Sequence, residues 1–224
     1  MSNFDLAVSF NRFAVACIPA MLGIILHEVA HGWMARRLGD PTAHALGRLT
    51  LNPVPHIDPM GLFAFAFTSI TGPFVFGWAK PVPVDIRYFR RPARDMMLVA
   101  LAGPLTNMLL AISFAVLLRL TLHFFSPLEW MDSGTYQFAL RSLHIGVIIN
   151  FSLAWLNLLP IPPLDGSRIL AWLMPGNLGW RFQQYGQYGF IILILLLATG
   201  LLSKVLGPLV LGSSELALLL VGIE

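Results

Sequence analysis

Residues 13–38, FAVACIPAMLGIILHEVAHGWMARRL, decide the fold of this chain. The run is apolar as far as Leu26 and closes on Arg36 and Arg37. About 20 apolar residues are enough for a helix to cross the hydrocarbon core of a bilayer. We therefore predict a transmembrane helix. Before this basic end, its second half also holds His27, Glu28 and His31, and such titratable side chains are costly inside a membrane and usually mark function.

The composition of the whole chain is that of a membrane protein. Of its 224 residues 57% are hydrophobic and 11% are charged, and the mean hydropathy is +0.75. An average soluble protein has about 25% charged residues, so these values exclude a disordered chain, a coiled coil and almost any soluble domain. The net charge of +3 fits basic loops on one side of a membrane better than nucleic-acid binding. The single cysteine, Cys17, excludes an internal disulfide and a multi-cysteine metal site.

Residues 61–78 form a second apolar segment of a different kind. They are rich in phenylalanine and β-branched residues, and Thr71-Gly72-Pro73 splits them, which is typical of two strands joined by a turn. Basic residues both precede and follow the segment, so a crossing would place basic loops on opposite sides of the membrane. We predict a re-entrant β-hairpin instead. Such backbone must be buried in protein or line a wet cavity.

The remaining apolar runs complete an all-α polytopic membrane protein with four to six transmembrane helices and this small re-entrant β-hairpin. Residues 1–224 are expected to form one domain with a core at 13–175. The predicted segments are the first helix 13–38, the hairpin 61–78, helices 96–122 and 143–159, a bend at 164–166, and C-terminal helices within 188–223. In the last of these we expect a spanning helix at 188–202, a break at Gly207-Pro208 and a short apolar tail.

The pentapeptide His27-Glu28-Val29-Ala30-His31 carries the sharpest chemical signal. Positions i and i+4 share a helix face, so both imidazoles can reach one metal ion. Glu28 beside them can take a proton from water, and bound zinc lowers the pKa of that water to about 7. The alternative is that the histidines pair with helix neighbours in the core.

A catalytic zinc site needs a third protein ligand and an open fourth position. Asp165 is our candidate, because it lies just past the end of the helix predicted at 143–159, at the depth of the two histidines. Pro160, Pro162 and Pro163 stop that helix and let the chain bend back toward the first one. The alternative for an aspartate before a glycine is a simple turn residue.

These motifs together resemble the site-2 protease family of intramembrane zinc metalloproteases. HEVAH in a membrane helix with Leu164-Asp165-Gly166 far downstream is the specific pair. Weaker pieces are similar too, namely residues 52–61, 77–84 and 102–107, so that the resemblance covers about residues 20–175. Many relatives carry PDZ or CBS domains, for which this chain has no room, so it is most similar to the minimal branch of the family.

The resemblance implies a function and a set of roles. His27, His31 and Asp165 would hold one zinc ion per chain, Glu28 would be the general base, and the hairpin would offer an edge to an unwound substrate strand. Asn107 would hold substrate or the oxyanion, with a helix–helix hydrogen bond as the alternative. The substrate would be a transmembrane helix of another membrane protein, cut near the cytosolic face of the cell membrane. The lipid bilayer is the other expected partner, and no nucleic acid is expected.

Two rival functions use the same residues. A metal-ion transporter or sensor would need polar residues at both depths of the membrane, whereas here they cluster at one depth. A pseudoprotease that binds membrane helices without cutting them would be expected to lack a ligand or the base. Two further residues, His56 and Asp58, could support the site or line a water path, although a turn held by prolines is the simpler interpretation.

Overall fold

A computed structural model of the chain describes residues 6–71, 78–125 and 133–223, and regular secondary structure there is helical. The elements are α1 (Leu6–Arg37), α2 (Thr42–Ala45), η1 (Val54–His56), α3 (Pro59–Thr71), η2 (Ile86–Tyr88), α4 (Pro92–Phe124), α5 (Gly134–Asn157), α6 (Asp165–Leu173), α7 (Leu178–Gln184), α8 (Gly186–Ala198) and α9 (Leu201–Leu220). Four helices in this part are long and apolar enough to cross a membrane: Phe10–Arg37 of α1, then α4, α5 and α9. This number falls within the predicted four to six.

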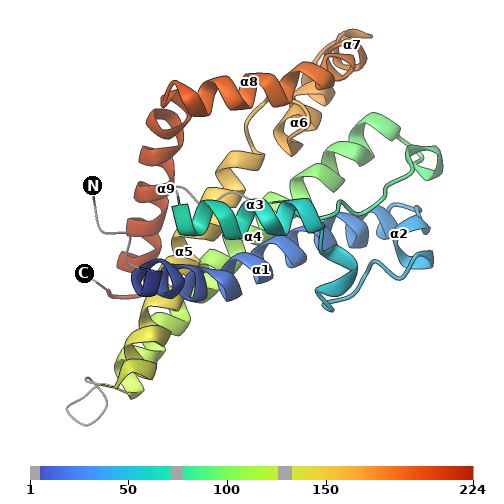
Figure 1. Cartoon of the computed structure of the whole chain (residues 1–224). Coiled ribbons are helices and arrows are strands. Elements are labelled where there is room, and N and C mark those ends of the chain that lie inside the picture. Colours follow the sequence, from blue (N-terminus) through green and yellow to red (C-terminus); the bar gives the residue numbers. More distant parts are fainter. Residues whose placement is uncertain (1–5, 72–77, 126–132, 224) are drawn as a thin grey trace.

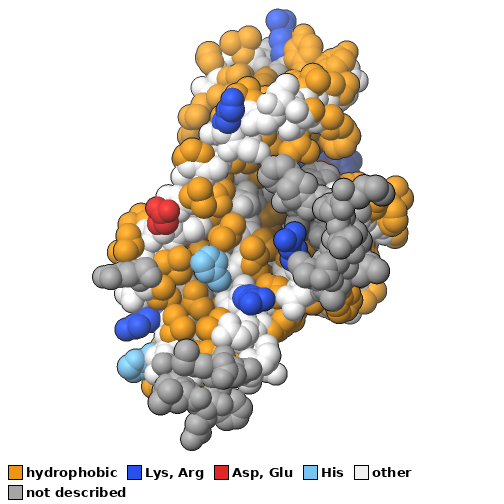
Figure 2. Space-filling model, turned by 60° about the vertical axis from the view of Figure 1, so that its left-hand side comes forward, with side chains coloured by type: hydrophobic (Ala, Val, Ile, Leu, Met, Phe, Trp, Pro, Cys, Tyr) orange, Lys and Arg blue, Asp and Glu red, His pale blue; other side chains and the backbone are white. Residues whose placement is uncertain are grey.

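Three of these helices, α1, α4 and α5, pack on one another and form the centre of the molecule (Figure 1). Small residues let the helices approach closely, as in many membrane bundles. Ala111 and Ala115 of α4 are fully buried, and a Cβ on Gly146 of α5 would lie 2.8 Å from the ring of Phe114. α9 covers the same cluster from the side through Val210 and other apolar residues. Figure 2 shows a face of the molecule on which hydrophobic side chains predominate and charged ones are few.

The prediction of two strands at 61–78 is wrong for residues 61–71, which lie in the helix α3. The start of this helix explains the difference. The Asp58 carboxylate accepts the N–H of Gly61 at 2.9 Å, and Pro59 occupies the first helical position. An acidic cap followed by proline is a strong signal for a helix start, and it outweighs the strand preference of phenylalanine. Residues 72–77 lie outside the described part, so the second predicted strand is not described.

The chain does return to its starting point after α3. Ile57 and Ala79 form an isolated antiparallel bridge, and the N–H of Lys80 donates to the carbonyl of His56 at 2.9 Å. The two ends of this segment therefore lie side by side. α3 packs against α1, with the rings of Phe65 and Phe13 5.7 Å apart.

The C-terminal helices also differ from the prediction. The run expected to span at 188–202 forms α8, which has 13 residues and is not among the four candidate spans. Gly200 adopts a positive φ of 69° and separates α8 from α9, a conformation that glycine takes at little cost. α9 then continues through Pro208, so the predicted break at that position is wrong. Membrane helices tolerate proline when neighbouring groups satisfy the freed backbone.

Candidate metal centre and active site

Three side chains from two distant parts of the chain converge at one point. His27 and His31 lie one turn apart in the last third of α1, and Asp165 is the first residue of α6. All three residues are buried. His27 Nε2 lies 2.9 Å from His31 Nε2, and Asp165 Oδ2 lies 3.2 Å and 3.3 Å from these two nitrogens. The structure therefore brings the three predicted ligands together.

Hydrogen bonds on the far side of each ring fix which nitrogen faces the centre. His31 Nδ1 lies 2.7 Å from the carbonyl oxygen of Val99, and His27 Nδ1 lies 2.6 Å from Oδ1 of Asn107. These oxygens can only accept, so each Nδ1 carries the hydrogen and each Nε2 presents a lone pair. Asp165 Oδ2 is a further acceptor, buried without a hydrogen-bond partner. Three acceptors that face one another repel unless a cation lies between them.

This donor set suits a zinc ion. Two imidazole nitrogens and one carboxylate oxygen leave the fourth position of a tetrahedron open, as catalytic zinc sites do. Ligands about 2.0–2.1 Å from zinc lie roughly 3.3 Å from one another in a tetrahedron. The observed separations of 2.9, 3.2 and 3.3 Å are close to that value. The carbonyl of Val99 and the amide of Asn107 are the outer partners that such histidines usually have.

The fold places Asp165 by a tight return of the chain. α5 ends at Asn157, and a Cβ on Gly166 would lie 2.1 Å from the carbonyl oxygen of Leu158. Only glycine lets α6 begin so close to the end of α5. Burial raises the pKa of Asp165 and is the largest single influence, but positive charge at the two imidazoles would oppose it and hold the pKa of this carboxyl below its usual range, as a cation between the three groups would. The ionised form, which a metal ligand requires, is therefore favoured.

Gly103 of α4 provides the space for both imidazoles. A Cβ at this position would lie 2.5 Å from His31 Nε2 and 2.6 Å from His27 Cε1. Real Cβ atoms do not approach other atoms so closely, so any side chain here would push the two rings away. The sequence contains Gly103 within a stretch that resembles the family, but nothing in that stretch says that the glycine touches the metal ligands.

We expect Gly103→Ala to weaken zinc binding by at least about tenfold, since displaced ligands cost at least as much as lost outer partners. Zinc affinity is measured by competition with a chelator on detergent-purified protein. Gly212→Ala on α9 is the matched control, because a Cβ there meets nothing within 4 Å. Equal affinity in both variants would contradict the close packing of α4 on the histidines.

Glu28 is half-buried on α1 between the two histidines. Its Oε2 accepts the backbone N–H of Val82 at 2.7 Å. Val82 belongs to residues 78–85, a non-helical segment that we call the strap. The bond orients the carboxylate and leaves Oε1 free of that contact.

The strap is itself held at two points. The buried Arg48 donates from Nη2 to the carbonyl of Lys80 at 2.7 Å, and the N–H of Asp85 donates to Oδ2 of the buried Asp40 at 2.7 Å. Because charged groups form stronger hydrogen bonds than neutral ones, these contacts fix the backbone on either side of the donor to Glu28. The sequence did not predict these contacts of the strap, because every residue except proline has a backbone N–H and none is marked by residue type.

Asn107, predicted to bind substrate, lies behind His27 and is fully buried. Its Oδ1 faces His27, and its Nδ2 donates to the carbonyl of Gly23 and to Oδ1 of Asn150, both at 3.0 Å. Asn150 donates in turn to the carbonyl of Gly146 at 2.9 Å. The side chain thus joins α1, α4 and α5, which corresponds to the helix–helix alternative, and its substrate role stays a prediction. Asn150 was missed, although an asparagine inside an apolar run was a signal that could have found it.

His56 and Asp58 belong to a turn. His56 ends η1 and is buried, with Nε2 2.9 Å from the carbonyl oxygen of Thr50, and Asp58 caps α3. These contacts favour the turn interpretation over a supporting pair for the metal site.

Comparison with known proteins identifies the family. A family model described as "Peptidase family M50" matches residues 15–197. The chain belongs to peptidase family M50. Its relatives in that family include "Putative zinc metalloprotease YwhC" of Bacillus subtilis, 38% identical over 85% of this chain and 83% of the relative. "Putative zinc metalloprotease MJ0611" of Methanocaldococcus jannaschii is 42% identical over 76% and 74% of the two chains. "Putative zinc metalloprotease Rip2" of Mycolicibacterium smegmatis is 31% identical over 82% and 66%.

Membership of family M50 confirms the predicted site-2 protease family and the predicted class of enzyme, a metalloprotease. With four helices able to cross a membrane, the M50 chain is a multi-pass membrane protein. No solved structure matches it.

Proposed function

We propose that this M50 peptidase is a zinc-dependent endopeptidase that hydrolyses peptide bonds within transmembrane segments of other membrane proteins. The observation that carries the proposal is the set of three buried ligand atoms, His27 Nε2, His31 Nε2 and Asp165 Oδ2, which lie within 3.3 Å of one another. A zinc ion bound there would activate water and polarise the carbonyl of the bond to be cut.

The residues around the site supply the proton transfers. Glu28 takes a proton from the attacking water and later gives it to the leaving nitrogen, because the base of the first step is the acid of the second. The N–H of Val82 keeps the carboxylate oriented throughout. Val99 and Asn107 hold the two imidazoles in the tautomer that directs Nε2 to the centre.

The position of the site in the chain supports a substrate inside the membrane. His27 and His31 belong to a helix that can span the bilayer, and they lie within two to three turns of its basic end at Arg36 and Arg37. Basic residues favour the cytoplasmic side, so we propose that the site opens toward the cytoplasm from a multi-pass protein of the cell membrane. A substrate helix must unwind locally before its peptide bond can reach the site. The strap, a non-helical segment beside Glu28, is the part of the backbone along which an unwound strand would lie.

The test is cleavage of a reporter protein with one transmembrane segment, reconstituted in lipid vesicles with the purified enzyme. We expect mass spectrometry of the products to place the cut inside the apolar segment, and a zinc chelator to stop the reaction until zinc is restored. A soluble protein carrying the same segment sequence flanked by charged residues is the control, and should be cut at least about tenfold more slowly. Cuts confined to loops outside the membrane would contradict the proposal.

A further inference from the structure

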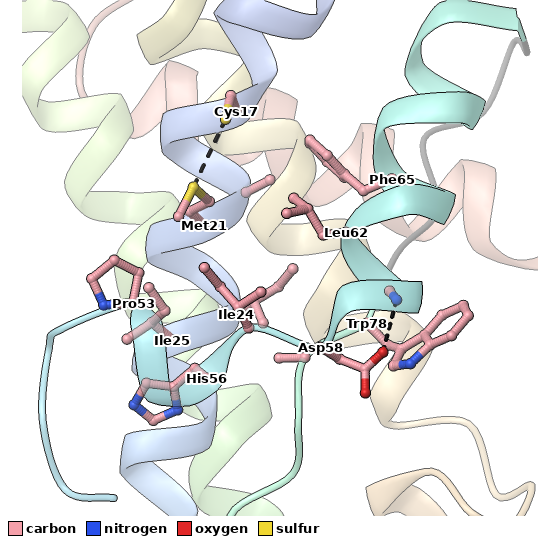
Figure 3. A pocket seen from close by; sticks show the side chains of 14 residues that line it. Cys17, Met21, Ile24, Ile25, Pro53, His56, Asp58, Leu62, Phe65 and Trp78 are labelled. Atoms are coloured by element: carbon pink, nitrogen blue, oxygen red, sulfur yellow. Dashed lines mark hydrogen bonds between the residues drawn. The ribbon is translucent and has the colours of Figure 1, made fainter.

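A cavity of about 70 Å³ lies between α1 and α3, next to the start of the strap. Figure 3 shows Cys17, Met21 and Ile24 of α1 facing Leu62 and Phe65 of α3 across it. Since a single water needs about 10–15 Å³ of such space, the cavity has room for a side chain of several heavy atoms. None of the roles assigned above uses this cavity.

The wall of the cavity is apolar apart from Asp58 and His56, and the buried Nδ1 of His56 has no hydrogen-bond partner in the described part of the chain. Asp58 accepts the N–H of Gly61, and His56 Nε2 faces the carbonyl of Thr50 (Figure 3 shows the first bond). Trp78 closes the cavity near Gly61, where a Cβ would lie 2.0 Å from the Trp78 carbonyl oxygen. The chemistry of the cavity therefore suits an aliphatic group.

One wall of the cavity lies on the helix face that also carries the proposed catalytic base. Cys17, Met21, Ile24 and Glu28 follow one another at helical spacings of four, three and four, so they lie on one face of α1. One turn of helix, about 6 Å, separates Ile24 from Glu28. On the other wall the strap leads from Ala79, which lines the cavity, to the N–H that Glu28 accepts. The two walls therefore belong to segments that meet again at the hydrogen bond between Glu28 and Val82, three to four residues beyond the lining.

α3 forms the wall of the cavity opposite α1. Phe65, which lines the cavity, is 7% exposed, whereas Phe63 and Phe67 on the other side of the helix are 65% and 56% exposed. Their rings stack 6.1 Å apart. The face of α3 with Phe63 and Phe67 is therefore turned outward, and the face with Phe65 is turned toward α1.

We propose that this cavity is a specificity pocket that takes one aliphatic side chain of the substrate. The inference rests on the proposed function and names how the site selects its substrate. An extended strand advances about 3.3 Å per residue, so a pocket beginning about 6 Å from Glu28 receives a residue within three positions of the cut. Phe65 and the small buried Ala20 of α1, which also lines the pocket, set its size.

The test compares variants that change the pocket in opposite directions. Phe65→Leu enlarges the pocket and Ala20→Val fills it. Phe67→Leu is the control, because it is the same substitution as Phe65→Leu on the exposed side of α3. Each enzyme is assayed on the transmembrane reporter, with every position within four residues of the cut set in turn to Ala, Val, Leu or Phe. One methylene group in a hydrophobic pocket changes kcat/KM by roughly 10- to 200-fold.

We expect a single position, within three residues of the cut, at which the two variants shift the preference in opposite senses. Phe65→Leu should raise kcat/KM for the reporter with Phe at that position, relative to the reporter with Val, about tenfold. Ala20→Val should lower kcat/KM for the reporter with Leu, relative to the reporter with Ala, by a similar factor. Phe67→Leu should change neither ratio by more than about twofold. Lower activity on all reporters without a change of preference would assign the cavity to a lipid chain or to packing, and would overturn the proposal. A wild-type enzyme that cuts no membrane-embedded reporter would overturn the proposed function, and the pocket with it.

Discussion

Glu28→Gln is expected to abolish cleavage while leaving the metal in place. Glutamine has the same shape as glutamate, and its carbonyl oxygen can still accept the N–H of Val82 that now lies 2.7 Å from Oε2. The amide cannot take a proton from water, so the reaction loses its general base. Such a loss lowers the rate by about 10²- to 10⁴-fold. None of the three converging ligand atoms belongs to Glu28, so the zinc content should stay within about twofold of the wild type.

The measurement is a single-turnover assay on the transmembrane reporter, beside the zinc content of the same preparation. Glu215→Gln is the matched control, because it makes the same chemical change on an exposed side chain of α9. It should cut at the wild-type rate within about twofold. Cleavage by Glu28→Gln at the wild-type rate would show that another group is the base.

The same experiment separates the enzyme from its rivals. A membrane transporter or sensor that uses the histidines would move or report zinc equally well with glutamine at position 28. A pseudoprotease would retain a bound reporter without cutting it, with glutamate or with glutamine. We expect the enzyme outcome, because Glu28 is half-buried next to a metal-ligand candidate and a backbone donor orients its carboxylate.

The sequence predicts those parts of the molecule that depend on local spacing. Apolar runs of spanning length indicated α1, α4 and α5, and the spacing of four between His27 and His31 placed both on one helix face. The proline-rich turn before Asp165 led to the third member of the cluster because prolines end a helix wherever it lies. The roles of these residues as ligands remain predictions for the experiments above and below.

The predictions that were wrong involve competing local signals, and the contacts that the sequence did not predict involve backbone atoms. Residues 61–71 have the composition of a strand, but the Asp58-Pro59 start makes them helical. The run at 188–202 was apolar enough to span, but Gly200 divides it. The donor of Val82 and the acceptor of Val99 are main-chain atoms, which every residue has, so only the folded chain shows that they face Glu28 and His31.

Asp165→Ala is expected to remove most of the zinc and with it the activity. The substitution leaves two imidazole ligands, which lie one turn apart on α1. Loss of an outer partner weakens zinc binding by 10- to 100-fold, and loss of a ligand itself should exceed this, so we expect roughly a thousandfold or more. Asp85→Ala is the control, since Asp85 pairs with the exposed Arg87 at 2.6 Å and takes no part in the cluster.

A thermal measurement makes this prediction independent of cleavage. A ligand that binds only the folded protein stabilises it by RT ln(1 + [L]/Kd), about 2.7 kcal/mol at one hundred times Kd. Wild type and Asp85→Ala should therefore melt at a higher temperature when zinc is added, and Asp165→Ala at the same zinc concentration should not. Because the ligand atoms come from α1 and α6, this difference would show that zinc joins segments 134 residues apart in the chain. An equal rise in all three proteins would exclude Asp165 as a ligand and leave the histidine pair as the only part of the site that binds metal.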